Sequence, residues 1–115
     1  MTAAYGELLG ALSRERGVLA CMVVDAADDI IIDAVARHGV KSSTVAALGA
    51  SLYRKARQSS GAARLGEVRF LRLEAERGHV FAAGRGGMVL VLLAEPGVNV
   101  GLVRVEMLRS AEALS

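Results

Sequence analysis

The chain has 115 residues, of which 53% are apolar and 23% are charged, with a single proline. This composition predicts one folded domain over residues 1–115 and excludes both a disordered chain and a coiled coil. The formal net charge is only +2 and the basic residues are spread along the chain, so we do not expect a nucleic-acid-binding protein.

The first ten residues, MTAAYGELLG, show no basic start followed by an apolar block, so no signal peptide is expected. No apolar segment approaches the ~18 residues needed to span a bilayer. The lone Cys21 lies in the apolar run GVLACMVV, where we expect a buried, unreactive thiol, and a single cysteine fits a reducing compartment. These features together predict a soluble cytoplasmic protein.

The N-terminal third predicts a helix followed by two strands. Apolar residues recur at helical spacing from Tyr5 to Leu12. The segment from Val18 to Val24 is apolar throughout, which is typical of a strand buried on both faces. Asp28 and Asp29 suit a tight turn into a second strand from Ile30 to Ala36.

The middle of the chain predicts a helix from Thr44 to Gln58. Ser42 or Ser43 is expected to cap its first turn, because a hydroxyl can accept a hydrogen bond from an unpaired backbone N–H there. The polar and small residues SSGAARLG, at 59–66, are expected to end the helix.

The C-terminal part predicts three strands and a final helix. The segment EVRFLRLEAE, at 67–76, alternates apolar and charged residues, which suits an edge strand. HVFAA at 79–83 and the apolar run Met88 to Ala94 follow, joined by GRGG at 84–87. Asn99 is the expected N-cap of the last helix.

The predicted order is α-β-β-α-β-β-β-α. The strands Val18 to Val24 and Met88 to Ala94 are apolar on both faces, so they belong at the centre of the sheet. The fold class is therefore an α/β sandwich around one five-stranded, mostly antiparallel sheet with helices on both faces, a layering similar to that of profilin.

Two glycine-containing stretches stand where a nucleotide-binding loop would stand, but neither has the required pattern. A Walker loop needs lysine directly after its second glycine, and here Val40 separates Gly39 from Lys41. The GRGG stretch lies between two strands, whereas a dinucleotide fingerprint opens a helix, so we interpret it as a hairpin turn.

The side chains that could bind a metal or perform catalysis are scattered along the chain. His38 and His79 are far apart in the sequence and no second cysteine accompanies them, so we expect solvated imidazoles. The serines lie in loop or capping positions without a neighbouring histidine. We therefore expect no catalytic residue, no cofactor and no metal, and we do not expect an enzyme.

The helix from Thr44 to Gln58 carries two adjacent apolar stripes. One stripe consists of Val45, Leu48, Leu52 and Ala56. The other consists of Ala46, Gly49, Ala50 and Tyr53. Together they cover an arc of about 200°, whereas a helix packed on one sheet needs about 100°. We expect the aliphatic stripe to face the chain's own sheet and the small-residue stripe to contact a second copy, because small residues permit close approach. The alternative is that the small-residue stripe packs under the loop at 59–66.

These features resemble the Roadblock/dynein light chain family. The resemblance rests on the element order, the size, the small-residue helix and the closing run PGVNVGLVRVEMLRSAEAL, and it extends from Leu8 to Leu114. Its most family-like parts are GVLACMVVD, MVLVLLAE and the turn from Asn99 to Arg104. The chain departs from the pattern at DAADD, where bacterial relatives often have glycine.

The resemblance implies a homodimer in which the second helices pack antiparallel and the edge strands join into one continuous sheet. The dimer contacts that it implies are Ala46, Gly49, Ala50, Tyr53, Val68 and Phe70. Family members are scaffolds and regulators of small Ras-like GTPases, and the bacterial ones of the MglB kind are GTPase-activating partners that remodel the GTPase's own residues without an inserted arginine finger. Arg54, Lys55 and Arg57 are candidate GTPase contacts, with ordinary solvated charges as the alternative.

Two other functions remain open at this stage. One is a small-molecule sensor with a pocket between the sheet and a helix. The other is a scaffold that binds its partner without changing GTP turnover.

Overall fold

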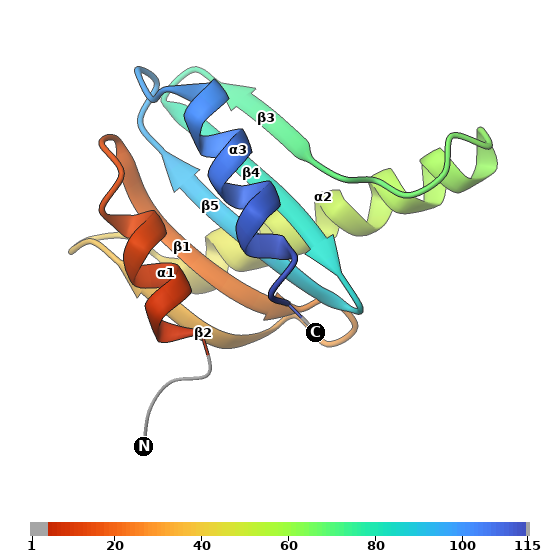
Figure 1. The fold of residues 1–115 in the computed structure, drawn as a ribbon, viewed down its shortest axis with the longest axis horizontal. Helices are drawn as coiled ribbons and strands as arrows, with labels where there is room; N and C mark the ends of the chain where they lie inside the picture. The colour runs from red at the N-terminus through yellow and green to blue at the C-terminus, as the bar shows by residue number, and fades with distance from the viewer. Residues whose placement is uncertain (1–4, 115) are drawn as a thin grey trace.

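Five strands form one antiparallel sheet between helices in the computed structural model, which describes residues 5–114 (Figure 1). Helices α1 and α3 cover one face of the sheet and α2 covers the other. The elements are α1 Gly6–Ser13, β1 Val18–Asp25, β2 Ile30–Ala36, α2 Ser42–Ala62, β3 Leu71–Ala75, β4 Gly78–Arg85, β5 Met88–Ala94 and α3 Val100–Ala111. The predicted order of elements and the fold class are confirmed.

The strands lie in the order β2-β1-β5-β4-β3, and every neighbouring pair is antiparallel. The two strands that are apolar on both faces, β1 and β5, lie inside the sheet, as predicted. The charged strand β3 lies at one edge, also as predicted, and β2 forms the other edge. Strands with continuous apolar sequence need cover on both faces, and only interior positions supply it.

The core has two layers because successive side chains of a strand point to opposite faces. In β1, Cys21 and Val23 pack with α1 and α3, while Met22 and Val24 pack on the side of α2. Phe81 of β4 is the largest fully buried side chain and belongs to the layer under α1 and α3.

Three local predictions are confirmed by backbone geometry. Gly86 and Gly87 have φ angles of +59° and +86°, as the hairpin between β4 and β5 requires. Asp29 in the turn between β1 and β2 also has a positive φ, of +56°. Asn99 caps α3, because its Oδ1 accepts a hydrogen bond of 3.0 Å from the backbone N–H of Leu102.

Helix α2 is longer than predicted at both ends. Its N-cap is Lys41, without a side-chain hydrogen bond, so the prediction of a cap at Ser42 or Ser43 is wrong. The helix continues through Ser59 and Ser60 and ends at Ala62. The first residues after it with non-helical, positive φ angles are Arg64, at +59°, and Gly66, at +88°. Its last turns and the connection to β3 project beyond the sheet (Figure 1).

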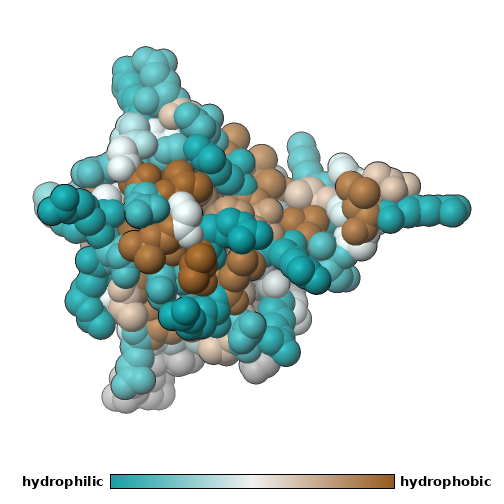
Figure 2. Space-filling model, turned by 45° about the horizontal axis from the view of Figure 1, so that its top comes forward, coloured by the Kyte–Doolittle hydropathy of each residue, from teal (hydrophilic) through white to brown (hydrophobic). Residues whose placement is uncertain are grey.

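We call the last turns of α2 and the connection at 63–70 the arm. Most of its residues are exposed, and Leu65 is 78% exposed. Figure 2 shows hydrophobic atoms where the arm leaves the body of the molecule and again near its tip. Within residues 5–114, no helix is both long enough and apolar enough to cross a membrane.

Candidate functional site

The small-residue stripe of α2 faces the chain's own sheet, which corrects the expectation that it contacts a second copy. Ala46, Gly49, Ala50 and Tyr53 are all buried within the subunit. A Cβ atom placed on Gly49 would lie 2.5 Å from Cγ1 of Val91 on β5. The branched side chains of the central strand already fill this layer, so only small residues let the helix backbone come close enough to pack.

Tyr53, in the middle of α2, packs against the sheet, and because it is buried it is likewise not available to a partner. A Cβ on Gly84 of β4 would lie 2.5 Å from Cζ of the Tyr53 ring, so the ring rests directly on that glycine. The Tyr53 hydroxyl donates a hydrogen bond of 3.0 Å to the carbonyl oxygen of Val68. Burial raises the pKa of Tyr53 above its usual value of 10.0.

The aliphatic stripe of α2 is the one left open. We call Val45, Leu48, Leu52 and Ala56 the aliphatic flank. Leu48 is 41% exposed and the other three side chains are half-buried, so this stripe covers the sheet only in part, through residues such as Val45, and not as its main packing face as expected. On the same face of the sheet, Leu71, Leu73 and Leu93 are also only half-buried. An apolar surface that the subunit does not cover therefore lies along α2.

The edge strand β3 is shorter than predicted, and this changes the role of two residues. Val68 and Phe70 precede β3 and have no strand pairing within the described chain. Val68 packs on the α2 side, whereas Phe70 packs on the other face, 5.6 Å from the Phe81 ring centroid and under the Arg104 guanidinium. On this side of the sheet, the edge open to a second strand is Leu71–Ala75, because it pairs only with β4; β2 forms the other edge.

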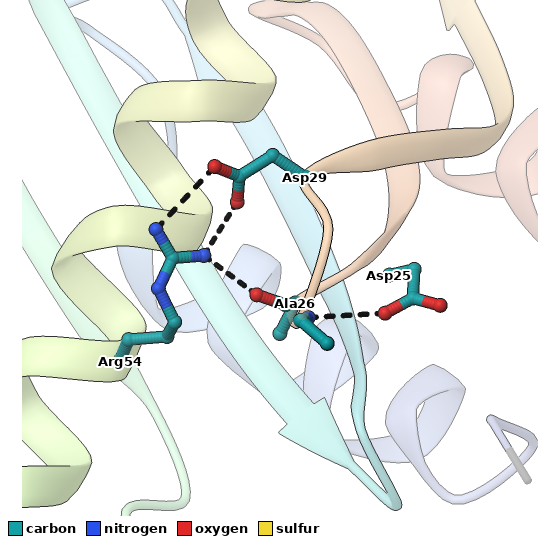
Figure 3. Close-up of polar contacts among 5 residues, drawn as sticks. Asp25, Ala26, Asp29 and Arg54 are labelled. Atoms are coloured by element: carbon teal, nitrogen blue, oxygen red, sulfur yellow. Dashed lines mark hydrogen bonds and ion pairs between the residues drawn. The ribbon is translucent and has the colours of Figure 1, made fainter.

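The three basic residues predicted as GTPase contacts are in different environments. Lys55 is exposed. Arg57 is also exposed, and its Nη2 lies 3.9 Å from Oε2 of Glu67. Arg54 is partly exposed but is engaged within the subunit. Its Nη1 donates a hydrogen bond of 2.6 Å to the carbonyl oxygen of Ala26 and pairs with Asp29 (Figure 3). Arg54 therefore ties α2 to the β1–β2 turn.

Asp29 is a residue whose role the sequence pattern did not indicate. Its position was attributed to turn formation alone, which the positive φ supports. The ion pair to Arg54 joins residues that are 25 positions apart, and no local pattern reports such a contact. In the same turn, Asp25 Oδ1 accepts a hydrogen bond of 3.0 Å from the backbone N–H of Ala27, which fixes the backbone beside Ala26 (Figure 3).

The residues with intrinsic reactivity are buried in structural positions. Cys21 is fully buried as predicted; desolvation and, to a smaller extent, the charge of Asp33 raise the pKa of its thiol to about 12. His79 is only 4% exposed, so the prediction of a solvated imidazole is wrong. Its Nε2 lies 3.1 Å from the Pro96 carbonyl oxygen and its ring stacks on Phe81. In the described part of the chain, no three His, Cys, Asp or Glu side chains gather as metal ligands would.

Two open clefts flank the arginine side of α2. The first, of about 750 Å³, lies between α2 and the connection to β3 and is lined by Arg57 and Arg64 among others. The second, of about 690 Å³, lies between that connection, the β4–β5 turn and the end of α3, where Arg69 and Arg85 line it. By contrast, α2 is in direct contact with the sheet at Gly49, which leaves no ligand pocket between them at that point.

Comparison with known proteins agrees with the architecture. The model of the Roadblock/LC7 domain matches residues 4–94. Among curated proteins, the uncharacterized protein MJ1340 of Methanocaldococcus jannaschii is 27% identical over 103 residues, which cover 90% of each chain.

Solved structures with the same fold include a Roadblock/LC7 domain from Streptomyces avermitilis, with a TM-score of 0.83 and 19% identity over 94% of this chain and 92% of that one. The gliding protein MglB of Thermus thermophilus aligns with a TM-score of 0.83 and 19% identity, over 99% of this chain and 90% of its own. An MglB with a tetrameric arrangement aligns equally well, with a TM-score of 0.84, 20% identity and the same coverage.

Proposed function

Since this chain belongs to the Roadblock/LC7 domain family, we propose that it is a homodimeric, non-catalytic regulatory module that binds a small Ras-like GTPase in the cytoplasm. Two observations support the proposal: α2 has an apolar surface that the subunit leaves uncovered, and β3 forms an open edge of the sheet. Uncovered apolar surface and a free strand edge are each a common basis for self-association.

The dimer that fits this surface has a two-fold axis, so the same patch of each subunit contacts its counterpart. The aliphatic flank of one α2 would pack against that of the other, and the two β3 edges would pair. Ala47 and Ser51 are small residues on the outer side of the same helix and would permit a close approach. The MglB relative with a tetrameric arrangement is a precedent for self-association within this fold.

The buried stripe contributes to this dimer only indirectly. Ala46, Gly49, Ala50 and Tyr53 hold α2 on the sheet, and so set the angle at which the aliphatic flank is presented. This replaces the interface implied by the sequence with one built from Leu48, Leu52 and the edge of β3.

Lys55 and Arg57 are the proposed GTPase contacts, because they are exposed and near the outer side of α2. Arg54 is a weaker candidate, since its guanidinium is occupied by Ala26 and Asp29. The role proposed for the module is to position the GTPase's own residues, without inserting a catalytic group of its own.

The test of the dimer is the replacement of Leu48 by Glu, with Leu102→Glu on α3 as a matched control. The two leucines are 41% and 42% exposed, so both changes place a carboxylate at a similarly exposed site. Leu48→Glu should give a folded monomer by light scattering, because an unpaired charge in an apolar contact is costly, while Leu102→Glu should stay dimeric. A folded Leu48→Glu dimer, or a monomeric wild type at micromolar concentration, contradicts the proposed interface.

The test of the partner is single-turnover GTP hydrolysis by a Ras-like GTPase of the same genome, with and without this protein. A raised rate identifies a GTPase-activating partner, and binding with an unchanged rate identifies a scaffold. A small molecule retained in native mass spectrometry, with no GTPase binding, would instead support the sensor function.

A further inference from the structure

The two open clefts beside α2 form one continuous surface. Both are lined by Arg57, Glu67 and Val68, so the segment that carries Glu67 and Val68 is bordered by a cleft on each side. A third, small cavity of about 40 Å³ beneath them is again lined by Arg57 and Glu67. A ligand crossing this surface would extend from the end of α2, past Arg57, to the end of α3.

The residues that line the two clefts carry an excess of positive charge. We call Arg57, Arg64, Arg69 and Arg85 the arginine surface. Only Glu67 and Glu112 among the residues lining the two clefts are acidic, whereas the whole chain has a net charge of only +2. The field at this surface therefore attracts anions more strongly than the overall charge suggests.

Most of these guanidinium groups are not neutralised. Within residues 5–114, neither Arg64 nor Arg69 takes part in an ion pair. Arg85 donates a hydrogen bond of 3.2 Å to the backbone carbonyl oxygen of Glu112, which leaves its charge uncompensated by a carboxylate. Exposed guanidinium groups of this kind bind carboxylates through paired hydrogen bonds.

Among the described residues, Arg57 is the one arginine of this surface that lies within ion-pair distance of a carboxylate, and the contact is loose. The distance from Arg57 Nη2 to Glu67 Oε2 is 3.9 Å, and the Glu67 side chain is 82% exposed. A pair this long and this exposed contributes little to stability. Glu67 is therefore placed where an incoming carboxylate would bind, and it can move away at small cost.

The lining favours a peptide over a nucleic acid. Leu108, Ala111 and Val68 supply apolar contacts in the second cleft. Tyr53 is the only aromatic residue that lines any of these three cavities, and it is buried under α2, so no ring is exposed for bases to stack on.

We propose that the arginine surface binds an acidic segment of a partner protein, and that Glu67 is a built-in competitor which this segment displaces from Arg57. The inference rests on the proposed function only in taking the ligand to be a protein; it does not require the partner to be a GTPase.

The probe is a fluorescein-labelled twelve-residue peptide of glutamate and alanine, measured by anisotropy at low salt on the full chain. Arg64→Gln together with Arg69→Gln should weaken binding about tenfold, whereas the control pair Arg14→Gln and Arg16→Gln, in the connection between α1 and β1, should leave it within about twofold. Glu67→Gln should strengthen binding about two- to fivefold, the range expected for removing an exposed competing charge.

Several outcomes would overturn the inference: no binding of the peptide, equal loss in both arginine pairs, or weaker binding by Glu67→Gln. Preferential binding of a single-stranded oligonucleotide of the same length and net charge would also overturn it. GTPase stimulation that is unchanged by Arg64→Gln and Arg69→Gln, without peptide binding, would refute this surface while leaving the proposed function intact. Peptide binding that responds to the variants, without any GTPase binding, would support this surface and contradict the proposed GTPase partner.

Discussion

The two flanks of α2 carry different chemistry although they belong to one helix. The aliphatic flank leaves Leu48 partly exposed beside half-buried leucines of the sheet. The opposite flank carries Arg54 and Arg57 and borders clefts lined by further arginines. Salt does not screen apolar burial, and kosmotropic salts strengthen it, whereas attraction between exposed charges is screened beyond about 10 Å at 0.1 M salt.

The two contacts proposed for α2 are therefore expected to be separable. The proposed apolar contact suits a permanent association between copies, and the proposed charged contact suits a partner that binds transiently. Between them, the small buried residues hold the helix at a fixed distance from the sheet, so both flanks depend on the same packing.

The largest effect is therefore expected where that shared packing is broken. Gly49→Leu would place a branched side chain against Val91, where even a Cβ would come within 2.5 Å. Overpacking should outweigh the gain in helix propensity and lower the free energy of unfolding by about 2 kcal/mol or more. Urea denaturation at fixed protein concentration measures the change.

Gly61→Leu is the matched control, because Gly61 lies in the same helix and a Cβ there meets nothing within 4 Å. It should leave stability unchanged or raise it by up to about 1 kcal/mol. If the two variants lost equal stability, the close approach of α2 to the sheet would be wrong.

A smaller effect, confined to the side of α2 that borders the arginine surface, is expected from Tyr53→Phe. The change removes the hydroxyl that donates to the Val68 carbonyl oxygen and should cost about 1 kcal/mol. Because Val68 lies in the segment between the two clefts, hydrogen exchange should become faster around residues 67–69. The dimer should persist, and a loss of the dimer would mean that the two flanks are not separable.

The smallest effect is expected from the ion pair of Arg54 with Asp29. Both side chains are partly exposed, so a double-mutant cycle with Arg54→Ala and Asp29→Asn should give a coupling of about 0.5 kcal/mol that declines with added salt. A coupling above about 2 kcal/mol would show that this pair, and not Gly49 and Tyr53, holds α2 in place.

The predictions from sequence succeeded where neighbouring residues determine the outcome. The apolar runs of β1 and β5 indicated interior strands, and alternation in β3 indicated an edge. The Asn99 cap and the glycines at 86 and 87 follow from hydrogen bonding and backbone geometry within a few residues.

The predictions failed where the outcome depends on what packs opposite. The stripe of Ala46, Gly49 and Ala50 was assigned to a partner because it is small, but the Val91 side chain already occupies the layer beneath α2. His79 was assigned to solvent because it lies at the start of a strand without a second metal-binding side chain nearby in the sequence, but that strand lies between β3 and β5 and the side chain is buried.

The sequence by itself determined which segments are helices and strands, and that α2 has more apolar surface than one sheet covers. Periodicity and turn chemistry are local, so they can be read along the chain. Only the tertiary structure decided which face of α2 is free and that arginines from α2, from the connection to β3 and from the end of β4 line one surface. Such outcomes depend on side-chain volumes and positions contributed by residues far apart in the chain, and no local pattern contains them.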